Sequence, residues 1–208
     1  MQRRSPTSAE GRRPNRRGES TRVQVLEAAL ALLSTGRQEA VSANLVAREA
    51  GVTWGTVQYR FGSVDGLWAA VIEHILDTAG PVVWARPKAK SVSGRVQEFV
   101  ELFWRALDSP YYVARTTLQS ALAASRPELE QDYPKTARAL HVVDETMEAQ
   151  CSRFFADLAV DRSRARRVAA MLPVALRGLH SERKYDPTFD AEEALVGLRD
   201  SVTLYLSR

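Results

Sequence analysis

The apolar residues of this 208-residue chain recur every three or four positions along most of its length, which is the spacing of one face of an α-helix. Val23, Leu26, Leu30 and Leu33 form the first such stripe, and similar stripes return in the later segments. The pattern predicts an all-α protein of about nine helices.

Hydroxyl side chains ahead of these stripes predict where the first helices begin. Ser20, Ser42, Thr53 and Ser63 can each accept a hydrogen bond from a backbone N–H of the following turn. We therefore expect helices over residues 20–34, 42–50, 53–61 and 63–77. A loop rich in proline and basic residues should follow over residues 80–90.

The helix over residues 53–61 is barely two turns long. Gly51 suits the left-handed conformation that closes the preceding helix. Val57 and Phe61 lie four residues apart on one face and must anchor the segment, because so short a helix is not stable alone. The other face offers hydroxyl, phenol and guanidinium groups, from Thr56, Tyr59 and Arg60. This arrangement is typical of a helix-turn-helix, whose second helix enters the DNA major groove.

Residues 41–67, VSANLVAREAGVTWGTVQYRFGSVDGL, resemble the DNA-binding head of the tetracycline-repressor (TetR) family of bacterial regulators. Two departures from the family pattern are Gln58, where a tyrosine is usual, and Val64, where a lysine is usual. Beyond about residue 76 only the number and length of the helices are similar. The residues that match at the family's spacing are Val46-Ala47, Ala50-Gly51-Val52, Gly55-Thr56, Tyr59 and Phe61.

The resemblance implies which side chains contact DNA. Base-edge contacts are implied for Trp54, Gly55 and Thr56, and phosphate or sugar contacts for Gln58, Tyr59 and Arg60. Asn44 lies where the family often has a base-contacting side chain, and Thr53 completes the set. Two alternatives stay open: helical spacing also places Trp54 toward the core, and Asn44 is equally compatible with a solvated surface.

Residues 1–19 carry six arginines against two glutamates, which accounts for the whole net charge of +4. This stretch is nearly free of apolar residues, so we expect it to be disordered. It is either a solvated leader or a basic arm that lies on DNA through Arg12, Arg13, Arg16 and Arg17. The arm is favoured because residues 20–80 hold four arginines against six acidic side chains, and DNA binding needs cations.

The rest of the chain is predicted to be a helical body over residues 81–208, joined to a DNA-binding domain over residues 20–80. Its helices are expected over residues 93–107, from Pro110, over 133–158, over 162–180 with a kink at Pro173, and from Asp190. Aromatic and long apolar residues of this part either fill the core or line a cavity for a small molecule. The candidate ligand-binding residues are Phe99, Phe103, Trp104, Tyr112, Leu118, Gln119, Met147 and Met171.

The resemblance also implies that the last two helices pair with those of a second copy. Two-fold symmetry then predicts DNA half-sites about one helical turn, roughly 34–36 Å, or a multiple apart. The candidate dimerisation residues are Leu172, Leu176, Leu179, Leu195, Leu198, Val202 and Tyr205.

Other chemistry has little support in the sequence. Cys151 has no second cysteine to pair with and is expected to be a small buried apolar residue. The three histidines are too far apart in sequence for a metal site, no nucleophile motif or phosphate loop is present, and we predict no cofactor and no enzyme activity. No apolar run is long enough for a membrane span or a signal peptide, so a cytoplasmic location is expected.

The sequence thus predicts a homodimeric one-component transcriptional regulator, a repressor that binds a palindromic operator and is released by a small, largely apolar effector. The alternatives are a ligand-independent architectural DNA-binding protein and, from another class, an all-α small-molecule carrier or enzyme. An architectural binder would lack the preference for one operator.

Overall fold

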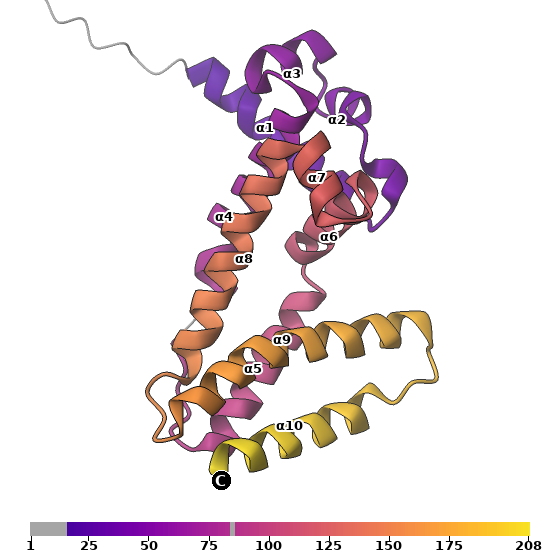
Figure 1. Cartoon of the computed structure of the whole chain (residues 1–208). Coiled ribbons are helices and arrows are strands. Elements are labelled where there is room, and N and C mark those ends of the chain that lie inside the picture. The colour runs from indigo at the N-terminus through magenta and orange to yellow at the C-terminus, as the bar shows by residue number, and fades with distance from the viewer. Residues whose placement is uncertain (1–15, 84–85) are drawn as a thin grey trace, which may run out of the picture.

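The computed structural model describes residues 16–83 and 86–208, which form ten α-helices and one 3₁₀ turn (Figure 1). The prediction of an all-α protein is confirmed. In the described part of the chain, no helix is both long and apolar enough to cross a membrane. The elements are α1 (Arg16–Leu33), η1 (Gln38–Ala40), α2 (Ala43–Glu49), α3 (Trp54–Phe61), α4 (Val64–Val83), α5 (Val92–Leu107), α6 (Pro110–Leu122), α7 (Arg126–Asp132), α8 (Pro134–Phe155), α9 (Arg162–Tyr185) and α10 (Ala191–Ser207).

The helices are arranged as a small head on a long body (Figure 1). Helices α1, α2 and α3 form the head, and α4 runs from the head along α8 toward the other end of the molecule. Helices α6 and α7 lie beside α8 near the head, whereas α5, α9 and α10 form the far end. Because α4 belongs to both regions, it connects the head to the body.

Two hydrophobic clusters hold these layers together. The first contains Val57 and Trp68 from the head side together with Leu118 of α6 and Leu140 of α8. The second packs α5 against α9, α10 and the end of α8, with stacked and edge-on contacts around Phe99. The first cluster therefore continues from the head into the body, and the boundary expected at residue 80 falls inside α4.

Several predicted helix boundaries were wrong. Helix α1 begins at Arg16, so Ser20 lies inside it and does not cap it, and Glu19 in its first turn suits the positive end of the helix dipole. Val23 is exposed, whereas the other three residues of the predicted stripe, Leu26, Leu30 and Leu33, are buried together with Val25. Helix α4 passes Gly80 and Pro81 and ends at Val83, since packing along α8 supports its whole length.

Helix α7 was not among the helices predicted from the sequence. Ser125 caps this helix by accepting a hydrogen bond from the Glu128 N–H at 3.4 Å. Pro127 lies in the first turn, where a missing N–H and a fixed φ cost nothing. The same holds for Pro134 at the start of α8, so both prolines begin helices.

Candidate DNA interface and body cavity

The turn between α2 and α3 has the geometry expected for a helix-turn-helix. Gly51 has φ +64°, a backbone conformation that residues with a Cβ atom rarely adopt. The Val52 N–H donates to the Ala47 carbonyl at 2.9 Å, which closes α2. Gln24 of α1 donates from its side-chain amide to the Ala50 carbonyl at 2.8 Å and so ties the turn to the first helix.

Helix α3 is anchored from behind, as predicted. The Thr53 hydroxyl accepts a hydrogen bond from the Thr56 N–H at 3.2 Å and caps the helix. Val57 and Phe61 are buried in the first hydrophobic cluster. Ser63 likewise caps α4 by accepting from the Gly66 N–H at 2.9 Å. The short helix therefore owes its position to two apolar side chains and two caps.

The opposite side of α3 faces solvent. Tyr59 is 83% exposed, and the Arg60 guanidinium carbon lies 5.8 Å from the centre of its ring. Gln58 and Gly55 are exposed, as are Thr53 and Asn44 on the turn side. Two candidates are less available: Trp54 packs partly against the head core, and the Thr56 hydroxyl lies 3.0 Å from that of Thr53.

The basic arm falls largely outside the described residues. Arg12 and Arg13 lie in the undescribed part. Arg16 and Arg17 lie in the first turn of α1, so the expectation that residues 16–19 are disordered was wrong. The physical reason is that Glu19 lies in the first turn of α1, where an acidic side chain is stabilised by the positive end of the helix dipole.

The structure brings cations to the head that sequence analysis did not find. A groove beside α3 is lined by Arg22 and Arg60 of the head and by Lys135 and Arg138 of α8, and the acidic Glu73 also lines it. Lys135 and Arg138 are more than 70 residues from the recognition helix in sequence, so no local pattern signals their approach. The excess of acidic groups in the head is thus offset in space by α8.

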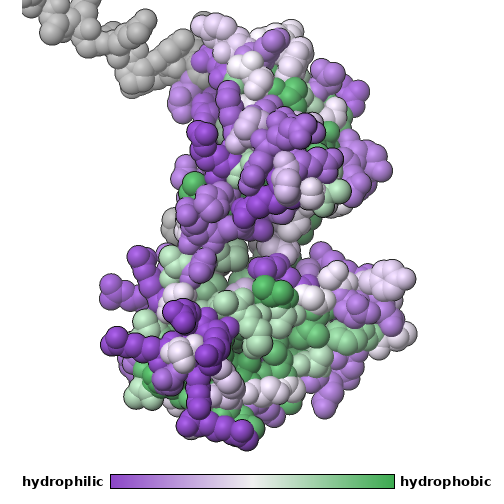
Figure 2. Space-filling model, viewed as in Figure 1, coloured by the Kyte–Doolittle hydropathy of each residue, from purple (hydrophilic) through white to green (hydrophobic). Residues whose placement is uncertain are grey.

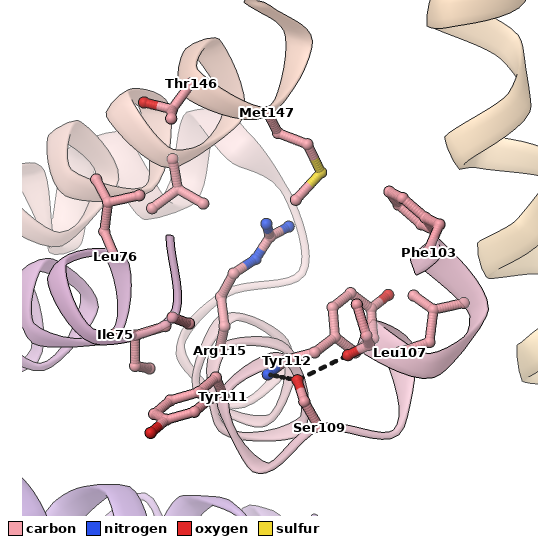
Figure 3. Close-up of a pocket in the computed structure, with 13 residues that line it drawn as sticks. Ile75, Leu76, Phe103, Leu107, Ser109, Tyr111, Tyr112, Arg115, Thr146 and Met147 are labelled. Carbon is pink, nitrogen blue, oxygen red and sulfur yellow. Dashed lines mark hydrogen bonds between the residues drawn. The ribbon is translucent and has the colours of Figure 1, made fainter. Parts of the chain in front are cut away.

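A cavity of about 90 Å³ lies in the body between α4, α5, α6 and α8 (Figure 3). Three of the predicted ligand-binding residues line it: Phe103, Tyr112 and Met147. None of the other ten was predicted, because the sequence does not show which faces of α4, α5, α6 and α8 meet. These are Ile75, Leu76, Ala79, Ala106, Leu107, Ser109, Tyr111, Arg115, Val143 and Thr146.

The other five predicted ligand-binding residues do not line the cavity. Phe99 and Leu118 are fully buried in the two separate core clusters, where they only fill space. Trp104 packs edge-on against His180 at 5.5 Å, Gln119 is exposed on α6, and Met171 is 49% exposed on α9. The helical spacing assigned these residues to apolar faces. It does not determine which neighbouring helix each face packs against.

Most of the predicted dimerisation residues lie in or against the chain's own core. Leu172 and Leu176 have no exposed surface, and Leu195 and Val202 are nearly as buried, because all four fill the chain's own second cluster. Leu179 and Leu198 are partly buried against that cluster, and Tyr205 is exposed. Apolar surface nevertheless remains exposed on α9 and α10 (Figure 2). Met171, Val174, Val196, Leu204 and Tyr205 are large apolar side chains exposed on these helices, and Met171 and Tyr205 line an apolar groove between the two helices.

Known proteins share this fold over nearly the whole chain. The chain is 26% identical over 197 residues to the HTH-type transcriptional regulator BetI of Paraburkholderia phymatum, covering 91% of this chain and 95% of BetI. The crystal structure of NalD, the secondary repressor of the MexAB-OprM multidrug efflux pump in Pseudomonas aeruginosa, aligns with a TM-score of 0.61 at 20% identity. That alignment covers 92% of this chain and 98% of NalD.

A structure from Mesorhizobium loti, assigned to the TetR family of transcriptional regulators, aligns equally well. Its TM-score is 0.61 at 17% identity, and the alignment covers 92% of this chain and 97% of that one. No protein-family model matches the chain.

The exposed face of α3, the helix-turn-helix behind it and the all-helical body are the features that the predicted DNA-binding protein requires. The chain shares its fold with these solved structures, one of them assigned to the TetR family, and is similar over nearly its whole length to the transcriptional regulator BetI.

Proposed function

We propose that this protein is a homodimeric repressor that binds a palindromic operator through α3 and leaves it when a small molecule enters the body cavity. The observation that carries this proposal is the two-sided character of α3. Val57 and Phe61 are buried, whereas Tyr59 is 83% exposed, so the helix offers a fixed polar face to a duplex.

The path from cavity to DNA runs through α4. Ile75, Leu76 and Ala79 of this helix line the cavity, and the same helix begins at Val64, three residues after α3 ends at Phe61. A ligand that fits better when α4 is tilted would change the spacing of the two recognition helices in a dimer. By linkage, DNA weakens the binding of that ligand by the same factor.

The second copy is proposed to pack on the outer face of α9 and α10. Val174 of α9 and Leu204 of α10 are 58% and 56% exposed, and Met171 and Tyr205 line an apolar groove between the same two helices. Exposed apolar patches of this kind mark interaction surfaces. A two-fold dimer through these helices would leave both heads free for half-sites about one DNA turn apart.

The cavity supports a ligand-controlled regulator over a ligand-independent architectural protein. A cavity costs packing free energy, and the buried cation of Arg115 in its wall costs electrostatic free energy. A protein that binds DNA without a ligand would gain nothing from either. Since the proposed partner is chromosomal DNA, we propose the cytoplasm as the place of action.

The proposal is tested by selecting bound sequences from a random duplex library at fixed salt. We expect a two-fold symmetric site, and we expect the double variant Thr56→Ala, Tyr59→Ala to lose specific binding while its thermal unfolding stays near that of the wild type. Tyr185→Ala is the matched control, because Tyr185 is equally exposed but lies at the end of α9. Recovery of the same site by the double variant would refute the assignment of the reading face.

A further inference from the structure

Arg115 of α6 is a cation without an adequate partner inside the body cavity. Its side chain is 12% exposed, and its Nε lies buried without any hydrogen-bond partner among the described residues. The nearest acid is Asp144 of α8, whose Oδ1 lies 3.7 Å from Nη2, beyond hydrogen-bond distance. Asp144 is half exposed and is bonded by Arg126 at 3.2 Å, so it is shared between two cations.

The surroundings of Arg115 compensate its charge only in part. Burial lowers the pKa of Arg115, Asp144 and Tyr112 raise it, and Arg177 of α9 lowers it again, yet an arginine in a protein stays protonated. The cavity wall itself is mainly apolar, and Ile75, Val143 and Met147 line it together with Arg115. Figure 3 shows the guanidinium reaching from α6 toward Met147, in the middle of the lining side chains. A buried cation in such a place is costly unless an anion joins it.

We infer that the cavity binds a small carboxylate with an apolar body, with the carboxylate on Arg115 and the body against Phe103, Ile75 and Met147. The inference rests on the proposed function and narrows the effector from a largely apolar molecule to an anionic one. The fork of Nε and an Nη donor matches the two oxygens of a carboxylate, and the unused Nε is the donor that such a pair needs. A cavity of about 90 Å³ fits a compact body, such as one ring or a short alkyl chain.

The competing explanation is that Arg115 is structural and acts through Asp144 alone. A structural pair would direct Nε or Nη donors at the carboxylate within about 3 Å. Here the separation is 3.7 Å, and the Arg126 guanidinium lies closer to the same carboxylate. The geometry thus leaves Arg115 free to meet a ligand anion.

The probes are matched pairs of acid and amide: benzoate with benzamide, phenylacetate with phenylacetamide, and hexanoate with hexanamide. Each pair keeps the apolar body and removes only the charge. Binding to the full-length protein without DNA is measured by calorimetry and by the shift in thermal unfolding. We expect at least one acid to bind about tenfold or more tightly than its amide, the scale of a charge-assisted hydrogen bond.

Two substitutions of Arg115 separate a ligand role from a structural one. Arg115→Gln should abolish the preference for the acid, whereas Arg115→Lys should keep part of it by retaining the charge. Neither the fold nor the ligand-free melting temperature should suffer from Arg115→Gln, because it removes a poorly compensated buried charge. Arg105→Gln, on the exposed side of α5, is the matched control and should keep the full preference.

The proposal is overturned if no acid binds better than its amide, or if Arg115→Gln keeps the preference. A large loss of ligand-free stability in Arg115→Gln and Arg115→Lys together would assign the residue to the fold instead. Operator retention is measured in parallel. If acids bind at Arg115 but do not release DNA, the carboxylate site is supported and ligand-induced release is refuted. If only amides release DNA, ligand-induced release is supported and the carboxylate site is refuted.

Discussion

Asp65 and Thr136 join the two longest helices of the first core at the head end of the molecule. Oδ1 of Asp65, in the first turn of α4, accepts hydrogen bonds from the Thr136 N–H at 2.9 Å and from its hydroxyl at 2.8 Å. Oδ2 accepts from the Lys135 N–H at 3.0 Å. Asp65 therefore acts as an N-cap for α8 from another helix, and it fixes α8 to the residues that follow α3.

Removing this cap should destabilise the protein and loosen the link between cavity and head. We expect Asp65→Ala to lower the free energy of unfolding by about 1–2 kcal/mol, since a cap and a buried hydroxyl partner are removed together. Urea denaturation measures the change. Asp77→Ala, exposed further along the same helix, is the control and should have little effect. Equal losses in the two variants would contradict a specific role for Asp65.

The basic arm should contribute to DNA affinity through phosphates. Because α1 begins at Arg16, deletion of residues 1–15 removes four arginines without cutting the helix. We expect the slope of log K against log[salt] to fall by about 0.9 for each DNA phosphate that the arm no longer neutralises. Lys135→Gln with Arg138→Gln tests the second source of cations in the same titration. An unchanged slope after the deletion would exclude the arm.

The outer face of α9 and α10 should hold the dimer together. We expect Val174→Glu to dissociate the dimer, because a charge would be buried at the centre of an apolar interface. Sedimentation equilibrium measures the oligomeric state. Val142→Glu is the control, since Val142 is comparably exposed on α8 but away from this face. A dimer that survives Val174→Glu but not Val142→Glu would place the interface elsewhere.

Asp108 should make stability depend on acid pH. Burial raises its pKa, but hydrogen bonds from His180 and Arg183, both at 2.8 Å, outweigh burial and leave the pKa below the ordinary 3.8. The stabilisation is therefore fully present above the ordinary pKa and is lost as the pH falls through the lowered one.

Asp108→Asn should melt at a lower temperature than the wild type near neutral pH, and the difference should shrink below about pH 4. Melting temperatures of both proteins across this range measure it. A difference that stays constant down to the lowest pH would show that the charge of Asp108 does not matter.

Cys151 should be unreactive in the folded protein. Burial raises the pKa of its thiol to about 12, so the reactive thiolate is scarce at neutral pH. We expect no alkylation by iodoacetamide in native buffer and complete alkylation in denaturant, as measured by intact mass. Rapid labelling of the native protein would reveal an opening of the second core.

The sequence by itself determined the features that depend on near neighbours. Caps such as Thr53 and Ser109, the turn at Gly51, and the anchors Val57 and Phe61 all act within four residues, so the recognition helix was predictable in outline. The same local information shows which face of each helix is apolar.

Only the tertiary structure decided which apolar face meets which. Arg115, Ile75 and Met147 lie on three helices, and no pattern along the chain announces that they share one cavity. In the same way, Leu172 and Leu176 could equally have faced a second copy, but packing against α5 and α10 placed them in the chain's own core. The hydrophobic effect is non-directional, so the sequence specifies only that the apolar face of a helix must be buried. The packing geometry of the whole fold determines which helix buries it.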